Sequence, residues 1–253
     1  MPPGPVDPPS RSRAQDRAPR GVGGSAQRCA REVLTVTRLQ SGDWVLEVGH
    51  GGLALPLARR GLNVCGVEET WSLLQTGRAS DADGEVLWVQ QEFRRLSFRR
   101  APFRAVLLPD FGLEPSARQQ VWRACFRLLA PGGSLLALHE PHDQMPERVE
   151  YRFFPSALAL ARARVPETPQ MRSWLTQVGC ARVRTNVVAA RVARSATERL
   201  EQVRRKAMWA LPLLDEDDFQ RGLTALEEHV LRAPDDPTVL TNTIALTYGR
   251  KLA

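Results

Sequence analysis

The sequence is poor in the residues that build metal centres and disulfide frameworks. It contains four cysteines and four histidines, no two cysteines form a C-x-x-C pair, and no two histidines stand at metal-ligand spacing. A disulfide-stapled fold and a zinc site are therefore not expected, and we predict no bound metal. Cys65 and Cys125 lie inside apolar patterns and are predicted to be small core residues.

Long apolar runs are also missing. No stretch approaches the roughly 18 consecutive apolar residues of a membrane-spanning helix, so no membrane partner is expected. No apolar run follows the arginines of residues 1–24, as a secretory signal would require, and we expect a cytoplasmic protein. These residues are rich in Pro, Gly, Ser and Arg and are predicted to form a disordered tail ahead of a single domain over residues 25–253.

Lysine is almost absent, with only Lys206 and Lys251, so the positive charge comes nearly entirely from arginine. The formal net charge of +7 suggests a nucleic-acid partner. The arginines are scattered over the whole chain, however, and no compact basic block is interleaved with aromatic residues. A GC-rich genome would give the same skew, so the sequence leaves a nucleic-acid partner unsupported and the oligomeric state unknown.

Short apolar strands alternate with helical patterns in the first part of the chain. Helices are predicted over 29–39, 53–60, 70–79 with Thr70 as N-cap, and 116–129 with its end near Pro131-Gly132-Gly133. This alternation predicts an α/β fold, a parallel sheet with helices on both faces. The five strands are predicted over 44–49, 63–68, 85–91, 103–110 and 134–140.

The remainder of the chain has a different pattern. Residues 141–170 contain five prolines and are predicted to be irregular. We expect 141–170 and 195–232 to form lid or substrate elements, and the two late strands to form an antiparallel hairpin that closes the sheet edge. Helices are predicted over 171–178, 196–211 and 216–231, and the late strands over 181–194 and 239–251.

Glycines and acids follow the parallel strands, where open α/β sheets bind ligands. Gly49-His50-Gly51-Gly52-Leu53-Ala54 formally matches the G-x-G-x-x-A dinucleotide fingerprint, which is weak evidence alone. Glu47 stands two residues before the first glycine, where an anion would repel a pyrophosphate and suit a cationic ligand. Glu68 ends the second strand, and its carboxylate suits the two hydroxyls of a ribose.

These motifs resemble those of class I S-adenosylmethionine-dependent methyltransferases. The matching pieces are VLEVGHGG, VCGVEE, QQEFRRLSF, FRAVLLPD and LLAPGGSLLALHE. The resemblance implies S-adenosyl-L-methionine as cofactor and a Rossmann-like, doubly wound, mostly parallel seven-stranded sheet with an antiparallel C-terminal hairpin and a helical insertion. It implies cofactor contacts by Glu47, Gly49, Gly51, Gly52, Glu68, Leu73, Glu92, Phe93 and Asp110.

Methyl transfer needs a base only when the acceptor is protonated. His139 and His142 follow the fifth strand, where the acceptor should approach, and they are the candidate bases; a polar loop residue bonded to backbone is the alternative for each. Glu69 is expected to begin the next helix and to interact only with its dipole.

The third glycine of the family loop is replaced by Leu53, which leaves three functions open. We expect methyl transfer to a small-molecule acceptor. The alternatives are an RNA or protein methyltransferase, suggested by the charge, and a non-catalytic Rossmann-like binding domain with a degenerate glycine loop. A nicotinamide-dependent dehydrogenase is disfavoured by Glu47 and by Pro131-Gly132-Gly133 before the fifth strand.

Overall fold

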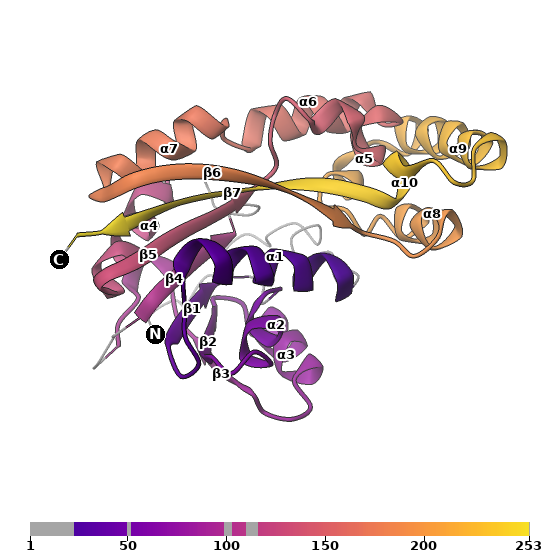
Figure 1. Cartoon of the computed structure of the whole chain (residues 1–253). Coiled ribbons are helices and arrows are strands. Elements are labelled where there is room, and N and C mark those ends of the chain that lie inside the picture. The colour runs from indigo at the N-terminus through magenta and orange to yellow at the C-terminus, as the bar shows by residue number, and fades with distance from the viewer. Residues whose placement is uncertain (1–22, 50–51, 99–102, 110–115, 253) are drawn as a thin grey trace, which may run out of the picture.

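A computed structural model of the chain describes residues 23–49, 52–98, 103–109 and 116–252. Most of the predicted N-terminal tail therefore lies outside the described residues, and helix α1 already begins at Gly23. All the predicted strands are present in one seven-stranded sheet with the order β3-β2-β1-β4-β5-β7-β6 (Figure 1). The strands are β1 (Trp44–Val48), β2 (Asn63–Glu68), β3 (Val86–Gln90), β4 (Phe103–Pro109), β5 (Leu129–His139), β6 (Cys180–Arg191) and β7 (Thr241–Lys251).

The sheet has a parallel part and an antiparallel edge. Strands β1 to β5 pair in parallel, because each is followed by a crossover that returns the chain to the same end of the sheet. β7 inserts between β5 and β6 and is antiparallel to both, which confirms the predicted hairpin. The carboxyl ends of β1 to β5 therefore meet at one edge, where the predicted ligand residues stand.

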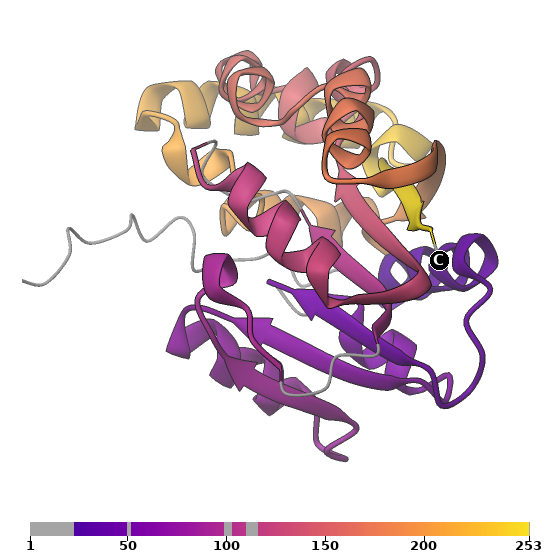
Figure 2. The ribbon, with the colours of Figure 1, turned by 90° about the vertical axis from the view of Figure 1, so that its left-hand side faces the viewer.

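Helices cover both faces of the sheet, and each face has its own apolar core. On one face, α1, α2 and α3 pack on the strands through residues such as Val33, Leu57 and Leu74. On the other, α4 and α7 contribute Trp122, Met171 and Leu175, so that α1 and α4 lie on opposite sides of the strands (Figure 2). These helices are α1 (Gly23–Thr37), α2 (Ala54–Ala58), α3 (Trp71–Ser80), α4 (Arg118–Leu128) and α7 (Thr168–Gln177).

Local signals predicted most helix ends correctly. Thr70 occupies the N-cap position of α3, although its side chain makes no capping hydrogen bond. α4 ends at Leu128, and the glycines that follow lie near the start of β5, where Gly132 has a φ of +73°. A Cβ on Gly133 would lie 2.9 Å from the carbonyl oxygen of Ala130, so only glycine fits there.

A third body of helices, which we call the cap, stands at the carboxyl edge of the sheet (Figure 1). It has a core of its own, with Phe154, Leu211, Phe219 and Leu226 among its buried residues. The chain enters the cap from the end of β5, leaves β6 into it and returns through β7. Its elements are η2 (Met145–Glu147), α5 (Val149–Arg152), α6 (Pro155–Arg164), α8 (Ala196–Arg204), η3 (Leu211–Leu213), α9 (Glu216–Arg232) and α10 (Pro237–Leu240).

Two predictions in this region are wrong. Residues 141–170 are not irregular, because Pro155 and Pro169 stand in the first turns of α6 and α7, where a missing N–H costs no helical hydrogen bond. The helix predicted over 196–211 ends at Arg204, and Lys206 adopts a φ of +50°, which breaks the helical path.

A buried ion network ties the cap to the sheet. Glu150 of α5 is 2% exposed and accepts hydrogen bonds from Arg148 Nε at 2.8 Å and Arg199 Nη2 at 2.8 Å. Asn242 of β7 donates to the same carboxylate at 3.2 Å. Glu140, just after β5, pairs with Arg148 at 3.2 Å and accepts from the Tyr151 hydroxyl. Two carboxylates and two guanidinium groups are thus buried together, and their pairing fixes the position of the cap relative to the sheet.

Removing one member of this network should be costly. Glu150→Ala would leave Arg199 and part of Arg148 buried without a counter-charge, and breaking such a pair destabilises a protein by about 3–5 kcal/mol. Urea unfolding measures this loss. Glu228→Ala, which removes an exposed partner 3.8 Å from Arg232, should leave the free energy of unfolding nearly unchanged. Equal losses in the two variants would contradict a special role of the network.

Candidate functional site

The candidate site lies at the carboxyl edge of the parallel strands. Glu47 and Gly49 stand at the end of β1, Glu68 ends β2, and Phe93 follows β3 in the short helix η1 (Phe93–Arg95). The structure brings these residues together across neighbouring strands. Of the predicted contacts, Gly51 and Asp110 lie outside the described residues and remain predictions.

The carboxylate of Glu47 closes the turn that follows β1. Its side chain is 1% exposed, and it accepts hydrogen bonds from the backbone N–H groups of Leu53, at 2.9 Å, and Ala54, at 2.6 Å. These amides begin α2, and helix-start N–H groups have no partner within their own helix. In a dinucleotide fold a pyrophosphate would satisfy such amides. Here the protein provides the anion itself, which disfavours a pyrophosphate at this position.

Burial raises the pKa of Glu47 to about 7; the hydrogen bonds from Leu53 and Ala54 oppose this rise, and the nearby charge of Glu68 adds to it. Because the folded pKa exceeds the ordinary value of 4.5, the neutral form is favoured in the fold. The free energy of unfolding should thus fall as the pH rises from about 4.5 through 7. A cationic ligand beside Glu47 and Glu68 would relieve this cost.

The two described glycines of the loop have different roles. Gly49 has a φ of +85°, a conformation that favours glycine, and its N–H donates to Val67 O at 2.8 Å. Gly52 is exposed and has open space where a Cβ would stand, so its backbone is accessible from solvent. Leu53, at the third glycine position, is buried in the core on the α1–α3 face of the sheet. The substitution by leucine therefore adds core packing and keeps the N–H that Glu47 binds.

The segment after β3 is held by Glu69, a role that the sequence did not suggest. Glu69 accepts a hydrogen bond from Phe93 N at 2.7 Å, so it does more than interact with a helix dipole. The Phe93 ring packs against the turn after β1, with its nearest atom 3.4 Å from where a Cβ on Gly49 would be. Glu92 points to its own segment and lies 3.5 Å from Arg94 Nε. Phe93 is thus placed beside the glycine turn, and the contact of Glu92 with the cofactor stays a prediction.

Glu68 and Leu73 remain candidates for the adenosine side of the site. Glu68 is 4% exposed and ends β2 beside β1. Leu73 is half-buried on α3, whereas its neighbour Leu74 is buried in the core. Glu68 therefore offers a buried carboxylate at the strand edge, and Leu73 offers apolar surface next to it along the chain.

The geometry argues against the predicted role of His139 as a base. Its ring is fully buried in the sheet, with Nε2 2.9 Å from Thr247 Oγ1 on β7 and Nδ1 3.4 Å from Glu140 O. Burial lowers the pKa of His139 to about 4, although the contact with the Glu140 carbonyl opposes this. A ring that is enclosed and costly to protonate is a core residue of the β5–β7 pair.

His142 is better placed for proton transfer. It is half-buried at the entrance to the cap, and its Nε2 lies 2.6 Å from the carbonyl oxygen of Val165. A carbonyl only accepts, so Nε2 carries the proton in this contact and the ring is fixed in one orientation. In the neutral imidazole Nδ1 is then the acceptor. This arrangement can accept a proton at Nδ1.

Two of the residues that build the site could not be found from local sequence. Glu69 and Tyr151 act through partners 24 and 11 residues away, respectively. No spacing rule links such positions; only the packing of loops at the strand edge does. Within the described part of the chain, no group of three or more His, Cys, Asp or Glu residues is arranged to hold a metal ion. No helix in that part is long and apolar enough to cross a membrane.

The comparison with known families agrees with the resemblance to methyltransferases found in the sequence. Residues 45–133 match a family described as "Methyltransferase domain". The matched segment runs from β1 to the glycines in the first part of β5, and so contains the Glu47 turn, Glu68 and Phe93. A comparison with proteins of curated function finds no match.

Solved structures show that the fold is that of class I methyltransferases. A putative methyltransferase from an antibiotic biosynthesis pathway of Anabaena variabilis is 17% identical, with a TM-score of 0.71 over 93% of this chain and 99% of that one. A putative sarcosine dimethylglycine methyltransferase from Galdieria sulphuraria is 14% identical, with 0.57 over 89% and 85%. Phosphoethanolamine N-methyltransferase 2 from Haemonchus contortus, in complex with phosphomonomethylethanolamine and S-adenosylhomocysteine, is 15% identical, with 0.54 over 88% and 53%.

The contact between Glu47 and the turn gives a stability prediction. Glu47→Ala would leave two buried N–H groups without an acceptor, each worth about 1–3 kcal/mol, partly offset by losing a buried carboxylate. Glu47→Gln keeps one acceptor oxygen and should lose less. Denaturant unfolding at pH 7 ranks the variants, with the exposed Glu85→Gln as a control near the wild type. A Glu47→Ala protein as stable as Glu85→Gln would show that the turn does not depend on this contact.

Proposed function

We propose that the chain is a class I S-adenosylmethionine-dependent methyltransferase and that its methyl acceptor is a small molecule. The observation that carries this proposal is the cap. It stands at the carboxyl edge of the sheet, beside the predicted cofactor residues, and its own apolar core and the buried network around Glu150 hold it there. A cover of this kind suits an acceptor that is enclosed.

The residues at the strand edge fit S-adenosylmethionine. Bound there, the cofactor supplies a methyl group already activated on a sulfonium centre. Glu47 and Glu68 are buried carboxylates close enough for the charge of one to shift the pKa of the other, which favours a positively charged ligand. In the proposal Gly49 and Gly52 admit the amino-acid part, Glu68 accepts from the ribose hydroxyls, and Leu73 and Phe93 border the adenine.

His142 is the proposed base for an acceptor that must lose a proton. Its Nε2–H donates to Val165 O, which orients the ring and leaves Nδ1 to receive the proton. The cap excludes water and positions the acceptor, which is most of what methyl transfer requires from a protein. His139 has no part in the proposal, because its ring is enclosed between β5 and β7.

The similar structures agree with a small acceptor. The names of two of them refer to sarcosine, dimethylglycine and phosphoethanolamine, which are small amines. An RNA or protein methyltransferase is the alternative that the charge favours. A non-catalytic binding domain is the alternative that the irregular glycine loop favours; against it, Leu53 keeps, in place of glycine, the N–H that Glu47 binds.

The acceptor class can be tested directly. The full chain is incubated with methyl-labelled S-adenosylmethionine and either pooled small amines, phenols and carboxylic acids, or total RNA, or denatured whole-cell protein. We expect label to be transferred to a small-molecule pool, and transfer to fall at least about tenfold in His142→Gln if the acceptor is protonated. Label found only in RNA or protein would contradict the proposal.

Glu68 gives a prediction about the cofactor. Glu68→Ala removes charge-assisted acceptors worth about 1.5–3 kcal/mol each, so affinity for S-adenosylhomocysteine should fall at least about tenfold. Glu68→Gln keeps one acceptor oxygen and should lose less. Glu69 is unsuitable as a control because it binds Phe93 N, so the exposed Glu85→Ala serves instead. Calorimetric titration measures the affinities, and equal values for Glu68→Ala and Glu85→Ala would contradict the assignment.

The pKa of Glu47 predicts a pH dependence of cofactor binding. With a pKa of about 7, Glu47 changes from mostly neutral to mostly ionised between pH 6 and pH 8. Affinity for the cationic S-adenosylmethionine should rise several-fold over this range. In Glu47→Gln the rise should be smaller, since no charge develops at that position. A pH profile that is the same in both proteins would show that Glu47 does not act on the cofactor.

A further inference from the structure

We propose that one side of this enzyme binds single-stranded RNA. The surface consists of the exposed sides of η1, α4, α6 and α7, and we call it the arginine face. It flanks the sheet, whereas the candidate active site lies at the carboxyl edge of the strands. The inference does not rest on the identity of the methyl acceptor. It concerns a second binding surface of the protein and not the molecule that the protein methylates.

The four elements of the arginine face carry basic residues and no acids. No Asp or Glu lies within the bounds of these four elements. Acids stand only at their ends, with Glu92 before η1 and Glu167 before α7. α4 and α7 share a core on the same side of the sheet, and α6 precedes α7 along that side (Figure 1). The exposed basic residues of the face are Arg94, Arg95, Arg123, Arg127, Arg162, Arg164 and Arg172.

Most of these arginines lack a counter-charge within the protein. In the described part of the chain, ion pairs on this face are made only by Arg94 and Arg95, both to Glu92 at 3.5 Å and 3.6 Å. The basic residues of α8 and α9 are different, since Arg204, Arg221 and Arg232 each pair with an acid. Charge is thus neutralised on α8 and α9 and left open on the arginine face. Exposed arginines outside this face, such as Arg28 and Arg191, also make no ion pair with the described residues, but they do not stand on acid-free helices grouped around an aromatic site. An open row of guanidinium groups is complementary to a phosphate backbone.

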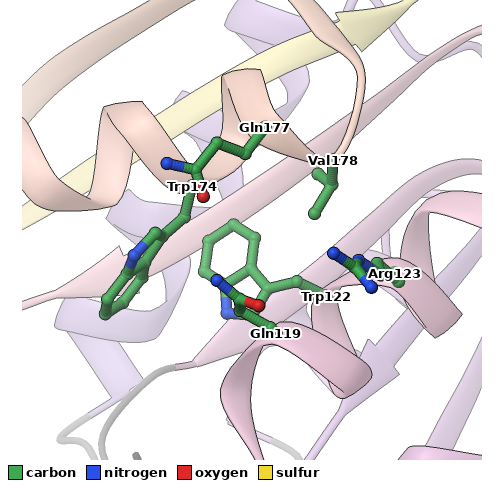
Figure 3. A pocket seen from close by; sticks show the side chains of 6 residues that line it. All are labelled: Gln119, Trp122, Arg123, Trp174, Gln177 and Val178. Atoms are coloured by element: carbon green, nitrogen blue, oxygen red, sulfur yellow. The ribbon is translucent and has the colours of Figure 1, made fainter.

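An aromatic site lies in the middle of the arginine face. Trp174 of α7 and Trp122 of α4 meet edge to face with ring centroids 6.4 Å apart, and Trp174 remains half-exposed. Figure 3 shows that a small pocket between the two helices is lined by these rings, by the amides of Gln119 and Gln177, and by Arg123. Bases of single strands stack on aromatic rings and bind amides through their edges. The guanidinium of Arg118 lies 5.6 Å from the centroid of the Trp174 ring, so a base would stack on the part of this ring that remains exposed, beside the amides of Gln119 and Gln177.

The same surface is unsuited to a membrane or to an apolar protein partner. The large apolar side chains that are exposed among the described residues are Trp44, Trp71, Leu87, Val187, Leu231 and Leu252, and none belongs to η1, α4, α6 or α7. Insertion into a bilayer or burial in a protein interface needs such side chains. Arginine with a single half-exposed tryptophan favours RNA over both.

The test is the affinity of the full chain for a labelled, mixed-sequence 20-nucleotide single-stranded RNA, measured by fluorescence anisotropy from 50 to 300 mM KCl. The triple variant Arg123→Gln, Arg127→Gln, Arg172→Gln should bind at least about tenfold more weakly at 100 mM salt. Each lost phosphate contact lowers the slope of log K against log salt by about 0.7, so the slope should fall by about 2. Trp174→Leu should weaken binding at least about fivefold and leave the slope unchanged.

The matched control carries the same change in net charge on the cap: Arg204→Gln, Arg221→Gln, Arg232→Gln. It should bind RNA within about twofold of the wild type with the same slope, and thermal melting confirms that each variant folds. Equal losses in the two triple variants would mean that net charge alone attracts RNA and would overturn the proposal. So would no binding at 50 mM salt, or tighter binding to phosphatidylserine vesicles or to an acidic peptide than to the RNA.

Discussion

The hydrogen bonds between Glu47 and the amides of Leu53 and Ala54 determine what the edge of this sheet can bind. The carboxylate satisfies the N–H groups that begin α2, although Leu53 stands where the family loop has its third glycine. The hydrogen bonds also place a negative charge where a dinucleotide fold would hold a pyrophosphate. The same carboxylate thus stabilises the turn and selects a cation. This arrangement buries the carboxyl group of Glu47 beside a second buried acid, Glu68. Burial raises the pKa of Glu47 to about 7, so ionising it in the fold costs free energy.

The cap and the sheet depend on each other through charge as well as packing. Glu140 and Glu150 lie near the end of β5, and Arg148, Arg199 and Asn242 bring three separate segments to them. A buried network of this kind adds little stability compared with apolar packing but penalises any other arrangement. On the outside, acids of α8 and α9 pair with the basic residues of those helices, whereas five exposed arginines of α4, α6 and α7 make no ion pair with the described residues.

Much of the fold could be predicted from the sequence, because its signals are local. The strands are short apolar runs, and Gly49 and Gly132 mark turns that need a positive φ. The site was harder to predict, because its chemistry depends on distant partners. His139 looked like a base at a strand end, but Thr247, 108 residues further on, shows it to be a core residue. Sequence alone also does not show that α4 and α7, which are apart in the chain, cover the same face of the sheet and place Arg123, Arg127 and Arg172 on its exposed side.

The central claim, that the Glu47 turn builds a site for a cationic adenosyl cofactor and not for a pyrophosphate, is tested most directly by calorimetric titration of the full chain with S-adenosylhomocysteine and, in parallel, with NADH. Both ligands carry an adenosine, but only NADH carries a pyrophosphate, and only S-adenosylhomocysteine carries an ammonium group. We predict that S-adenosylhomocysteine binds in the micromolar range, on the order of −8 kcal/mol, and that NADH gives no measurable heat. Binding of NADH without binding of S-adenosylhomocysteine would contradict the account.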